Sequence, residues 1–335
     1  MSPQHTRRTL LLGASLSLAL AACGHSAVPP TGGSKSRGVT LILDWYPNAD
    51  HAGIYGAVSQ GEFANAGLAV SVQTGATTTD QIPLVAAGKV DFAVTYEPDL
   101  LLARAQGTPV QAVFALVQQP LNCLIALRSS GITHPAQLQG KKVGTSGTPG
   151  DTAILNSVVR ADGGDPAKVT NINVGFNLVQ ALLGGKVDAI AGGYWNWEAV
   201  QIALEGQPVN VMRLNAWGVP NYDELVLIAS EGTVQKDPGL IQAFDAALAS
   251  GTRYAAAHPD AALQALLTAN PSLSRPLVQQ SLKDLTPAWN ASGKGYGYMD
   301  PTQWTAYAAW MRSEKWLTQA VDAGKAMTDA FLPPA

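Results

Sequence analysis

The 335-residue chain is poor in cysteine and in charged side chains. Its two cysteines, Cys23 and Cys123, are too few for a framework of disulfides or for a zinc site built from cysteines. Charged residues make up 13% of the chain, with 21 basic and 24 acidic side chains, and this mildly acidic balance disfavours nucleic acid as a partner. The length allows two domains with substantial cores, at roughly 100 to 200 residues per domain.

The chain also lacks the common catalytic motifs. It contains no Gly-x-Ser-x-Gly, no Gly-x-x-x-x-Gly-Lys-Ser/Thr and no His-Glu-x-x-His, and its five histidines are scattered. The sequence therefore does not indicate a nucleotide or zinc hydrolase. We expect no catalytic site, no cofactor and no metal centre.

The N-terminal apolar run, LLLGASLSLAL, is shorter than the ~20 residues that a membrane helix needs. It follows the basic segment HTRR and ends in Leu20-Ala21-Ala22-Cys23, which is typical of a signal peptide over residues 1–22. The ending resembles the lipobox of bacterial lipoproteins, and this resemblance implies lipidation of Cys23 at the outer face of the cell membrane. The pair Arg7-Arg8 leaves twin-arginine export open beside general secretion.

Residues 23–38 are rich in Pro, Gly and Ser and show no apolar period, so we predict a flexible tether there. The folded body should begin near Val39. Without Arg7 and Arg8 of the signal peptide, the net charge of the remaining chain is 19 minus 24, or −5.

Two segments of the chain repeat one pattern. LVAAGKVDFAVTY at 84–96 and LLGGKVDAIAGGY at 182–194 both carry Gly-Lys-Val-Asp, then small and apolar residues, then an aromatic residue. Each is typical of a helix closed by glycine, a tight turn and a short buried strand of a parallel sheet. We therefore predict two similar α/β lobes.

Polar and aromatic residues follow four of the predicted strands, at 44–51, 96–99, 144–151 and 194–198. Open parallel sheets bind ligands beyond the carboxyl ends of their strands, where helix N-termini direct N–H donors outward. We therefore expect these four junctions to line one cleft, with the backbone N–H groups of 144–151 binding a polar end of the ligand. None of the junctions contains Lys or Arg, which disfavours a strongly anionic ligand.

The same residues also allow a purely structural interpretation. The acidic residues and Asn196 can cap helices and complement their dipoles. A lone histidine such as His51 is often structural, and Trp195 and Trp197 can belong to the core.

Four segments together resemble one protein family: LDWYPNADHAGIYGAVSQGEFANAGLAV, GKVDFAVTYEPDLLLARAQG, VGFNLVQALLGGKVDAIAGGYWNWE and YDELVLIAS. They are similar to the substrate-binding proteins of ABC importers for the thiamine pyrimidine precursor, the ThiY type, within a group shared with fungal thiamine-pyrimidine synthases. The resemblance runs from Val39 to Ser230 and continues weakly beyond. Its specific part is Asp-Trp-x-Pro-Asn-x-x-His-Ala-Gly-Ile-Tyr, whereas many solute-binding proteins share Gly-Lys-Val-Asp.

This resemblance implies a type II periplasmic-binding-protein fold, with two α/β lobes around a ligand cleft and two crossover segments. We place the crossovers near 122–128 and 222–230, so that one lobe holds 39–125 plus 228–335 and the other holds 126–227. The implied function is that of a monomeric extracytoplasmic receptor. It would close on a thiamine-related aminopyrimidine, either formylaminopyrimidine or hydroxymethylpyrimidine, and deliver it to an ABC permease and its ATPase.

The resemblance also implies the residues of the cleft. The flat ring of an aminopyrimidine can stack on Trp45 or Tyr96. Asn196 can match its amino donor and ring-nitrogen acceptor, while Glu198 accepts from the amino group. The full set of expected ligand-binding residues is Trp45, Asn48, His51, Tyr96, Ser146, Asn196, Glu198, Trp217 and Tyr222.

One departure from the family pattern concerns enzymatic activity. The fungal synthases carry a cysteine-rich cluster where this chain has LNAWGVPNYDE, residues 214–224, without a cysteine. This difference argues for binding and against synthesis. Two alternatives stay open: the same fold binding another solute, such as a sulfonate, a flavin or another nitrogen heterocycle, and a synthase-like enzyme.

Overall fold

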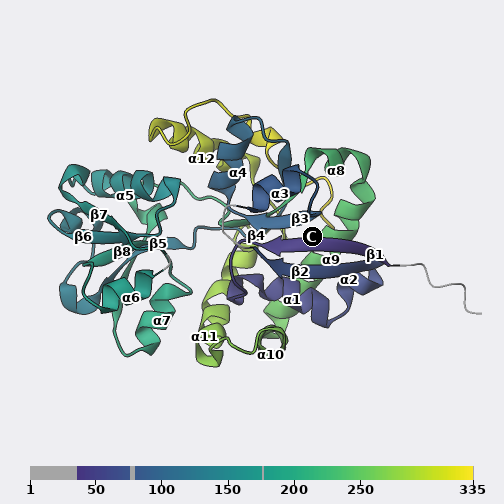
Figure 1. The fold of residues 1–335 in the computed structure, drawn as a ribbon, viewed down its shortest axis with the longest axis horizontal. Helices are drawn as coiled ribbons and strands as arrows, with labels where there is room; N and C mark the ends of the chain where they lie inside the picture. The colour runs from purple at the N-terminus through teal and green to yellow at the C-terminus, as the bar shows by residue number, and fades with distance from the viewer. Residues whose placement is uncertain (1–35, 76–79, 176, 335) are drawn as a thin grey trace, which may run out of the picture. The chain divides into compact units, whose positions relative to one another are not determined.

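Two five-stranded sheets organise the protein in the computed structural model, which describes residues 36–75, 80–175 and 177–334 (Figure 1). The predicted signal peptide, Cys23 and almost all of the predicted tether lie outside these residues. We call the part of the chain built on the first sheet the first lobe and the part built on the second sheet the second lobe.

The first sheet has the strand order β2-β1-β3-β10-β4. Its strands are β1 (Arg37–Leu43), β2 (Leu68–Thr74), β3 (Phe92–Thr95), β4 (Val110–Val117) and β10 (Leu225–Ser230). β1 pairs in parallel with β2 and β3, whereas β10 is antiparallel to β3 and β4. A C-terminal segment covers the outer edge of β4, because the N–H of Ala112 donates to Ala326 at 2.8 Å and the N–H of Thr328 donates to Ala112 at 3.0 Å.

The second sheet repeats this arrangement in the order β7-β6-β8-β5-β9. Its strands are β5 (Asn122–Leu127), β6 (Lys142–Thr145), β7 (Thr170–Asn173), β8 (Ala189–Tyr194) and β9 (Val209–Arg213). β6 is parallel to β7 and β8, and β5 is antiparallel to β8 and β9. In both sheets the fourth strand of the order therefore runs against its neighbours.

Helices cover both faces of each sheet. Figure 1 shows α5 on one face of the second sheet, with α6 and α7 on the other. The second lobe contains α5 (Pro149–Ala161), α6 (Leu178–Leu183) and α7 (Glu198–Leu204). The first lobe contains α1 (Ala52–Ser59), α2 (Glu62–Asn65), α3 (Gln81–Ala86), α4 (Glu97–Ala105), α8 (Glu231–Lys236), α9 (Pro238–Ala257), α10 (Pro259–Ala269), α11 (Arg275–Leu285) and α12 (Pro301–Ser313). Among the described residues, no helix has the length and apolar character to cross a membrane.

The Gly-Lys-Val-Asp repeat has the same structural role in both lobes. Gly88 and Gly185 follow α3 and α6 with φ of +64° and +67°, a left-handed conformation that ends a helix. The carboxylate of Asp91 accepts the N–H of Thr40 in β1 at 2.8 Å, and that of Asp188 accepts the N–H of Lys142 in β6 at 2.8 Å. The predicted pair of similar α/β units is confirmed, and each repeated aspartate ties its strand to the neighbouring parallel strand.

The crossovers differ from the predicted positions. Asn122–Leu127 form β5 of the second sheet and Leu225–Ser230 form β10 of the first, so the chain passes between the sheets at 118–121 and 218–224. The apolar run after Asn122 is a strand buried between β8 and β9 rather than a connection. The expected lobe boundaries at residues 125 and 227 therefore need correction.

Candidate functional site

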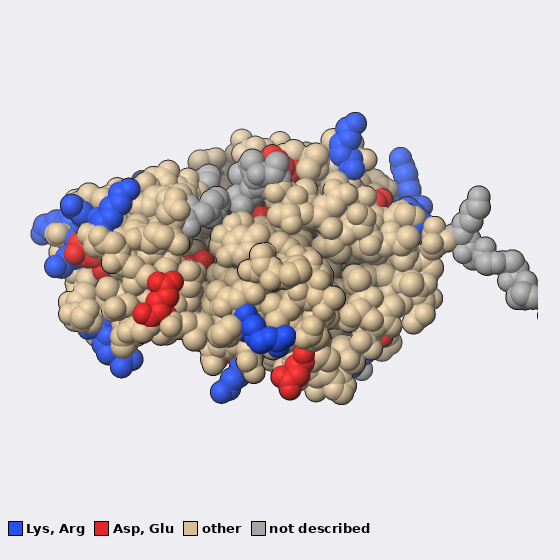
Figure 2. Space-filling view, turned by 60° about the horizontal axis from the view of Figure 1, so that its bottom comes forward, with Lys and Arg blue, Asp and Glu red and all other residues tan. Residues whose placement is uncertain are grey.

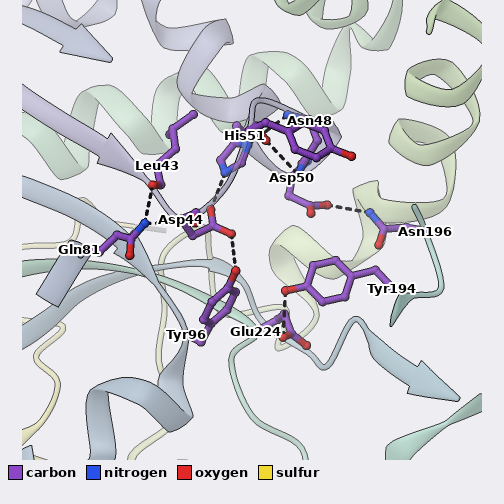
Figure 3. Close-up of polar contacts among 11 residues, drawn as sticks. Leu43, Asp44, Asn48, Asp50, His51, Gln81, Tyr96, Tyr194, Asn196 and Glu224 are labelled. Carbon is purple, nitrogen blue, oxygen red and sulfur yellow. Dashed lines mark hydrogen bonds and ion pairs between the residues drawn. The ribbon is translucent and has the colours of Figure 1, made fainter. Parts of the chain in front are cut away.

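The first junction centres on the carboxylate of Asp44, which directly follows β1 and is buried. Its Oδ1 lies 2.7 Å from Nε2 of His51, and its Oδ2 accepts the hydroxyl of Tyr96 at 2.9 Å. The Gln81 amide donates to the carbonyl oxygens of Leu43 and Asp44 at 3.0 and 3.1 Å and so fixes the end of the strand (Figure 3). Asp44 is thus held by groups from three segments of the first lobe.

His51 and Asn48 shape this junction from within. The Nδ1 of the fully buried His51 accepts the N–H of Asn48 at 3.3 Å, so Nε2 carries the proton that is donated to Asp44. The side chain of Asn48 accepts the N–H of Asp50 at 2.8 Å and caps the short 3-10 helix Ala49–His51. The ring nitrogens of His51 are therefore both engaged within the protein.

The junction at residues 194–198, called the second junction below, follows β8 and packs the second lobe against the first. Glu198 begins α7, and its Oε2 accepts the N–H of Tyr194 at 2.7 Å. The indole N–H of Trp197 donates to the hydroxyl of Tyr46 at 2.7 Å. The rings of Trp45 and Tyr46 lie 3.9 Å apart between centroids, so aromatic groups of both lobes form one continuous wall.

Asn196 differs from its predicted role. Its Nδ2 donates to Oδ1 of Asp50 at 2.7 Å and to the hydroxyl of Ser281 in α11 at 3.2 Å, which uses both amide hydrogens. Donation from Asn196 to a ligand therefore stays a prediction, and it would require one of these two bonds to be exchanged. Oδ1 of Asn196 and Oδ2 of Asp50 are buried and have no hydrogen-bond partner among the described residues, so the Asn196 oxygen remains an acceptor and the Asp50 oxygen accepts when its carboxylate is ionised.

The junction groups are acidic and phenolic. Burial raises the pKa of Asp50 to about 7, although His51 and the hydrogen bond from Asn196 act in the opposite direction. Burial likewise raises the pKa of Glu198 to about 7. Burial also raises the pKa values of the Tyr96 and Tyr194 hydroxyls, with a further contribution from neighbouring carboxylates. The ion pairs of Lys and Arg in the described part of the chain engage other carboxylates.

The third junction, 144–151, is closed on itself. The Asp151 carboxylate accepts the hydroxyl of Ser146 at 2.9 Å and the N–H groups of Gly147 and Thr148 at 2.7 and 2.9 Å. A local carboxylate engages the N–H groups of Gly147 and Thr148, so their binding to a ligand stays a prediction that would require these bonds to be exchanged.

Trp217 and Tyr222 do not join the other expected residues. Trp217 lies on a separate groove of about 610 Å³, which it shares with Trp195, Arg213 and Asp284, among others. Tyr222 is buried, with its ring centroid 4.5 Å from that of Tyr307. The structure thus brings together Trp45, Asn48, His51, Tyr96, Asn196 and Glu198, while Ser146 stays within its own loop.

Sequence reasoning left out several residues of this site. Figure 3 shows Asp44, Tyr96, Asp50 and Tyr194 converging from both lobes around a common space. Tyr194 ends the second repeat just as Tyr96 ends the first, so the repeat itself held the signal that could have identified it. In the sequence, Asp44 stands out only as the residue that ends a predicted strand, and Asp50 only as a possible helix cap, so neither was predicted to line the site.

Two wider features limit the chemistry of the site. Across the described ranges, no group of three or more His, Cys, Asp or Glu side chains is placed to hold a metal ion. On the face drawn in Figure 2, most of the surface is uncharged, and blue and red side chains occur together rather than as one extended basic patch.

Comparison with known families and proteins identifies relatives of the chain. A family model described as NMT1/THI5 like matches residues 48–262. The formylaminopyrimidine-binding protein of Halalkalibacterium halodurans is 36% identical over 298 residues, which cover 87% of this chain and 90% of that protein. The similarity therefore spans both lobes.

Other relatives carry different names. The riboflavin-binding protein RibY of Chloroflexus aurantiacus is 30% identical and covers 97% of this chain and 98% of its own length. A 4-amino-5-hydroxymethyl-2-methylpyrimidine phosphate synthase of Legionella pneumophila is 28% identical, with coverage of 89% and 93%. The similarity thus extends to binding proteins and to synthases.

Among solved structures, the periplasmic aliphatic sulphonate binding protein SsuA of Escherichia coli superposes with a TM-score of 0.71. The two chains are 15% identical, and the match covers 89% of this chain and 93% of that one. At this identity the likeness concerns the fold alone. The expected two-lobed periplasmic-binding-protein fold is confirmed.

Proposed function

The chain belongs to the NMT1/THI5-like family, and from this premise we propose that it is the extracytoplasmic solute-binding protein of an ABC importer, with a thiamine-related aminopyrimidine as its ligand. Its solute-binding character is supported by the fold and by the relative named for formylaminopyrimidine binding. The partners would be the small-molecule ligand, a permease and its ATPase, and the receptor would act as a monomer.

The observation that carries this proposal is the set of buried acceptors between the two lobes. Oδ2 of Asp50 and Oδ1 of Asn196 have no partner among the described residues, and Asp44 and Glu198 place further carboxylates nearby. A buried acceptor without a donor costs about 1 to 3 kcal/mol, so a ligand rich in N–H groups would be favoured. The exocyclic amino group of an aminopyrimidine supplies two such hydrogens.

The aromatic wall supports a flat ligand. Three aromatic rings lie where the first and second junctions are in contact: those of Trp45, Tyr46 and Trp197. Stacking on such rings contributes about 0.5 to 1.5 kcal/mol beyond the burial of area. A flat heterocycle with donor groups on one edge combines both requirements, and formylaminopyrimidine and hydroxymethylpyrimidine have this form.

Two other ligand classes compete with the pyrimidine. A flavin is also flat, and the 30% identity to the riboflavin-binding protein keeps it as the second candidate. A sulfonate is less suitable, because a permanent anion would meet Asp44, Asp50 and Glu198 without a cation from the junctions.

Binding without catalysis fits the residues better than synthesis. Residues 214–224 contain no cysteine, and the only cysteine of the described chain, Cys123, is buried. Burial raises the pKa of its thiol, which suppresses the reactive thiolate.

The decisive experiment is titration calorimetry of the mature protein with formylaminopyrimidine, hydroxymethylpyrimidine and thiamine, together with native mass spectrometry of the purified protein. Riboflavin and an alkanesulfonate serve as comparison ligands. We expect the tightest binding for one of the pyrimidines. Binding of riboflavin or the sulfonate in their place would show that the ligand assignment is wrong, and turnover of pyridoxal phosphate would show an enzyme.

The predicted lipid anchor has its own test. Cys23→Ser should release a soluble protein that still binds the ligand, because residues 23–38 separate the modified cysteine from the folded body. Membrane fractionation of cells carrying this variant and the unchanged protein measures the effect. An unaltered membrane fraction would contradict lipidation of Cys23.

A further inference from the structure

Both segments that connect the lobes meet at the carboxylate of Glu224. This residue lies at the end of the connection 218–224 and is 4% exposed. Its Oε2 accepts the N–H groups of Leu121 and Asn122, at 2.7 and 3.0 Å, from the end of the other connection. A single side chain therefore ties one connection to the other.

Tyr194 links this carboxylate to the ligand-facing junction. It is the last residue of β8 and is half-buried, and its hydroxyl donates to Oε1 of Glu224 at 3.2 Å (Figure 3). Its backbone N–H is held by Glu198, the first residue of α7. One tyrosine thus reaches from the site to the connecting segments.

The equivalent tyrosine of the first lobe behaves differently. Tyr96 occupies the same place in the repeat, and its hydroxyl donates at 2.9 Å to Asp44, which belongs to the same lobe. The two sheets have matching strand orders, so the fold does not by itself require Tyr194 to contact a connection. This difference between matched residues points to a specific role for the Tyr194–Glu224 pair.

We propose that Glu224 is a positioning residue that sets the angle between the lobes and couples this angle to the bound ligand through Tyr194. The coupling to ligand rests on the proposed binding function, whereas the control of the lobe angle does not. A ligand that contacts Tyr194 orients its hydroxyl, and the hydroxyl in turn orients the carboxylate that holds both connections. In such a buried, low-dielectric network each hydrogen bond is strengthened by the others.

The electrostatic setting agrees with this role. Glu224 accepts four donors: the two N–H groups, Tyr194, and the hydroxyl of Tyr222 at 3.0 Å. Burial raises the pKa of Glu224, and these hydrogen bonds oppose the rise. Three of these donors go to Oε2 and only Tyr194 goes to Oε1, where the –NH₂ group of a glutamine amide could not accept the Tyr194 hydroxyl.

The test measures the lobe angle directly. Spin labels on Asp260→Cys in the first lobe and Lys168→Cys in the second, both at exposed positions, report the distance between lobes in the full mature protein. Glu224→Gln and, separately, Tyr194→Phe should change the distance distribution of the ligand-free protein. Each should also weaken formylaminopyrimidine binding by about three- to tenfold.

Two control variants distinguish a loss of coupling between the ligand and the lobe angle from a general loss of stability or affinity. Tyr222→Phe removes a hydrogen bond to the same oxygen of Glu224, but its ring is buried against Tyr307. It should lower stability and weaken binding less than Tyr194→Phe does, because Tyr222 packs against Tyr307 rather than at the ligand-facing junction. Tyr96→Phe should weaken binding without altering the distance distribution, because its hydroxyl donates to Asp44 of its own lobe rather than to a connection.

A double-mutant cycle then measures whether Glu224 and Tyr194 act together in ligand binding. Glu224→Gln should weaken binding less in a Tyr194→Phe background than alone, since the two residues act together. Additive effects on affinity, or an unchanged distance distribution in both single variants, would overturn the proposal.

If Glu224→Gln does not fold, Tyr194→Phe decides the outcome by its distance distribution. If the unchanged protein binds no pyrimidine, the proposed function fails, while the ligand-free distances still decide the role of Glu224.

Discussion

The carboxylate of Glu198 accepts the backbone N–H of Tyr194 at 2.7 Å, so its removal would strand a buried donor as well as any ligand contact. Glu198→Gln keeps an oxygen for that N–H and removes only the second carboxylate oxygen. We expect this variant to weaken aminopyrimidine binding by at least about tenfold, or ~1.4 kcal/mol, with little change in the melting temperature of the free protein.

Calorimetry with the aminopyrimidine and its deaminated analogue checks this prediction. Glu198→Gln should reduce the preference between them, whereas Trp45→Ala should weaken both equally by removing one face of the stack. A variant that binds and discriminates normally would show that Glu198 serves only the start of α7.

At the scale of elements, α1 and α9 approach closely through glycine. A Cβ atom on Gly251 would lie 2.4 Å from the Cβ of Ala57, so no side chain fits between the helices. We expect Gly251→Ala to destabilise the protein by about 1 to 3 kcal/mol through overpacking. Thermal unfolding measures the effect.

Gly239→Ala is the matched control in the same helix, since nothing lies within 4 Å of its added Cβ. It should be neutral or stabilising by up to about 1 kcal/mol, because alanine reduces the freedom of the unfolded chain. Equal melting temperatures for Gly251→Ala and the unchanged protein would contradict a tight α1–α9 contact.

The elements that the sequence predicted well are those fixed by neighbouring residues. Gly88 and Gly185 end α3 and α6, and the strands that follow them are short and apolar, so the repeat indicated both units. The strand β5 was missed because NCLIAL becomes a strand only by pairing with β8 and β9. The donors of Asn196 were unpredictable for a similar reason: its partners Asp50 and Ser281 are 146 and 85 residues away in sequence.

For the whole molecule, stability should fall as the pH rises toward neutrality. Burial raises the pKa values of Asp50 and Asp223 from 3.8, and of Glu198 from 4.5, to about 7. Between about pH 4 and about pH 7 the folded protein therefore holds more protons than the unfolded chain, so these groups stabilise most fully below about pH 4. Their contribution is lost as the pH passes about 7.

Melting temperatures of the free protein between about pH 5 and about pH 8 check this prediction. Asp50→Asn should flatten part of the slope, because it removes one of the carboxyls whose pKa is raised by burial. Asp260→Asn, at an exposed position, should leave the slope as it is. A melting temperature that rises from about pH 5 to about pH 8 would contradict the buried, protonated carboxyls.

The strand order of the first sheet also governs when each lobe can be completed during synthesis. All strands of the second sheet come from one continuous stretch, Asn122 to Arg213, whereas β10 of the first sheet begins only at Leu225 and the edge of β4 is covered by Ala326 and Thr328. A chain that emerges with its N-terminus first therefore presents β3 and β4 long before the strand that separates them exists. The lobe that starts the chain is the last to finish folding, and its unpaired strands need shielding until then.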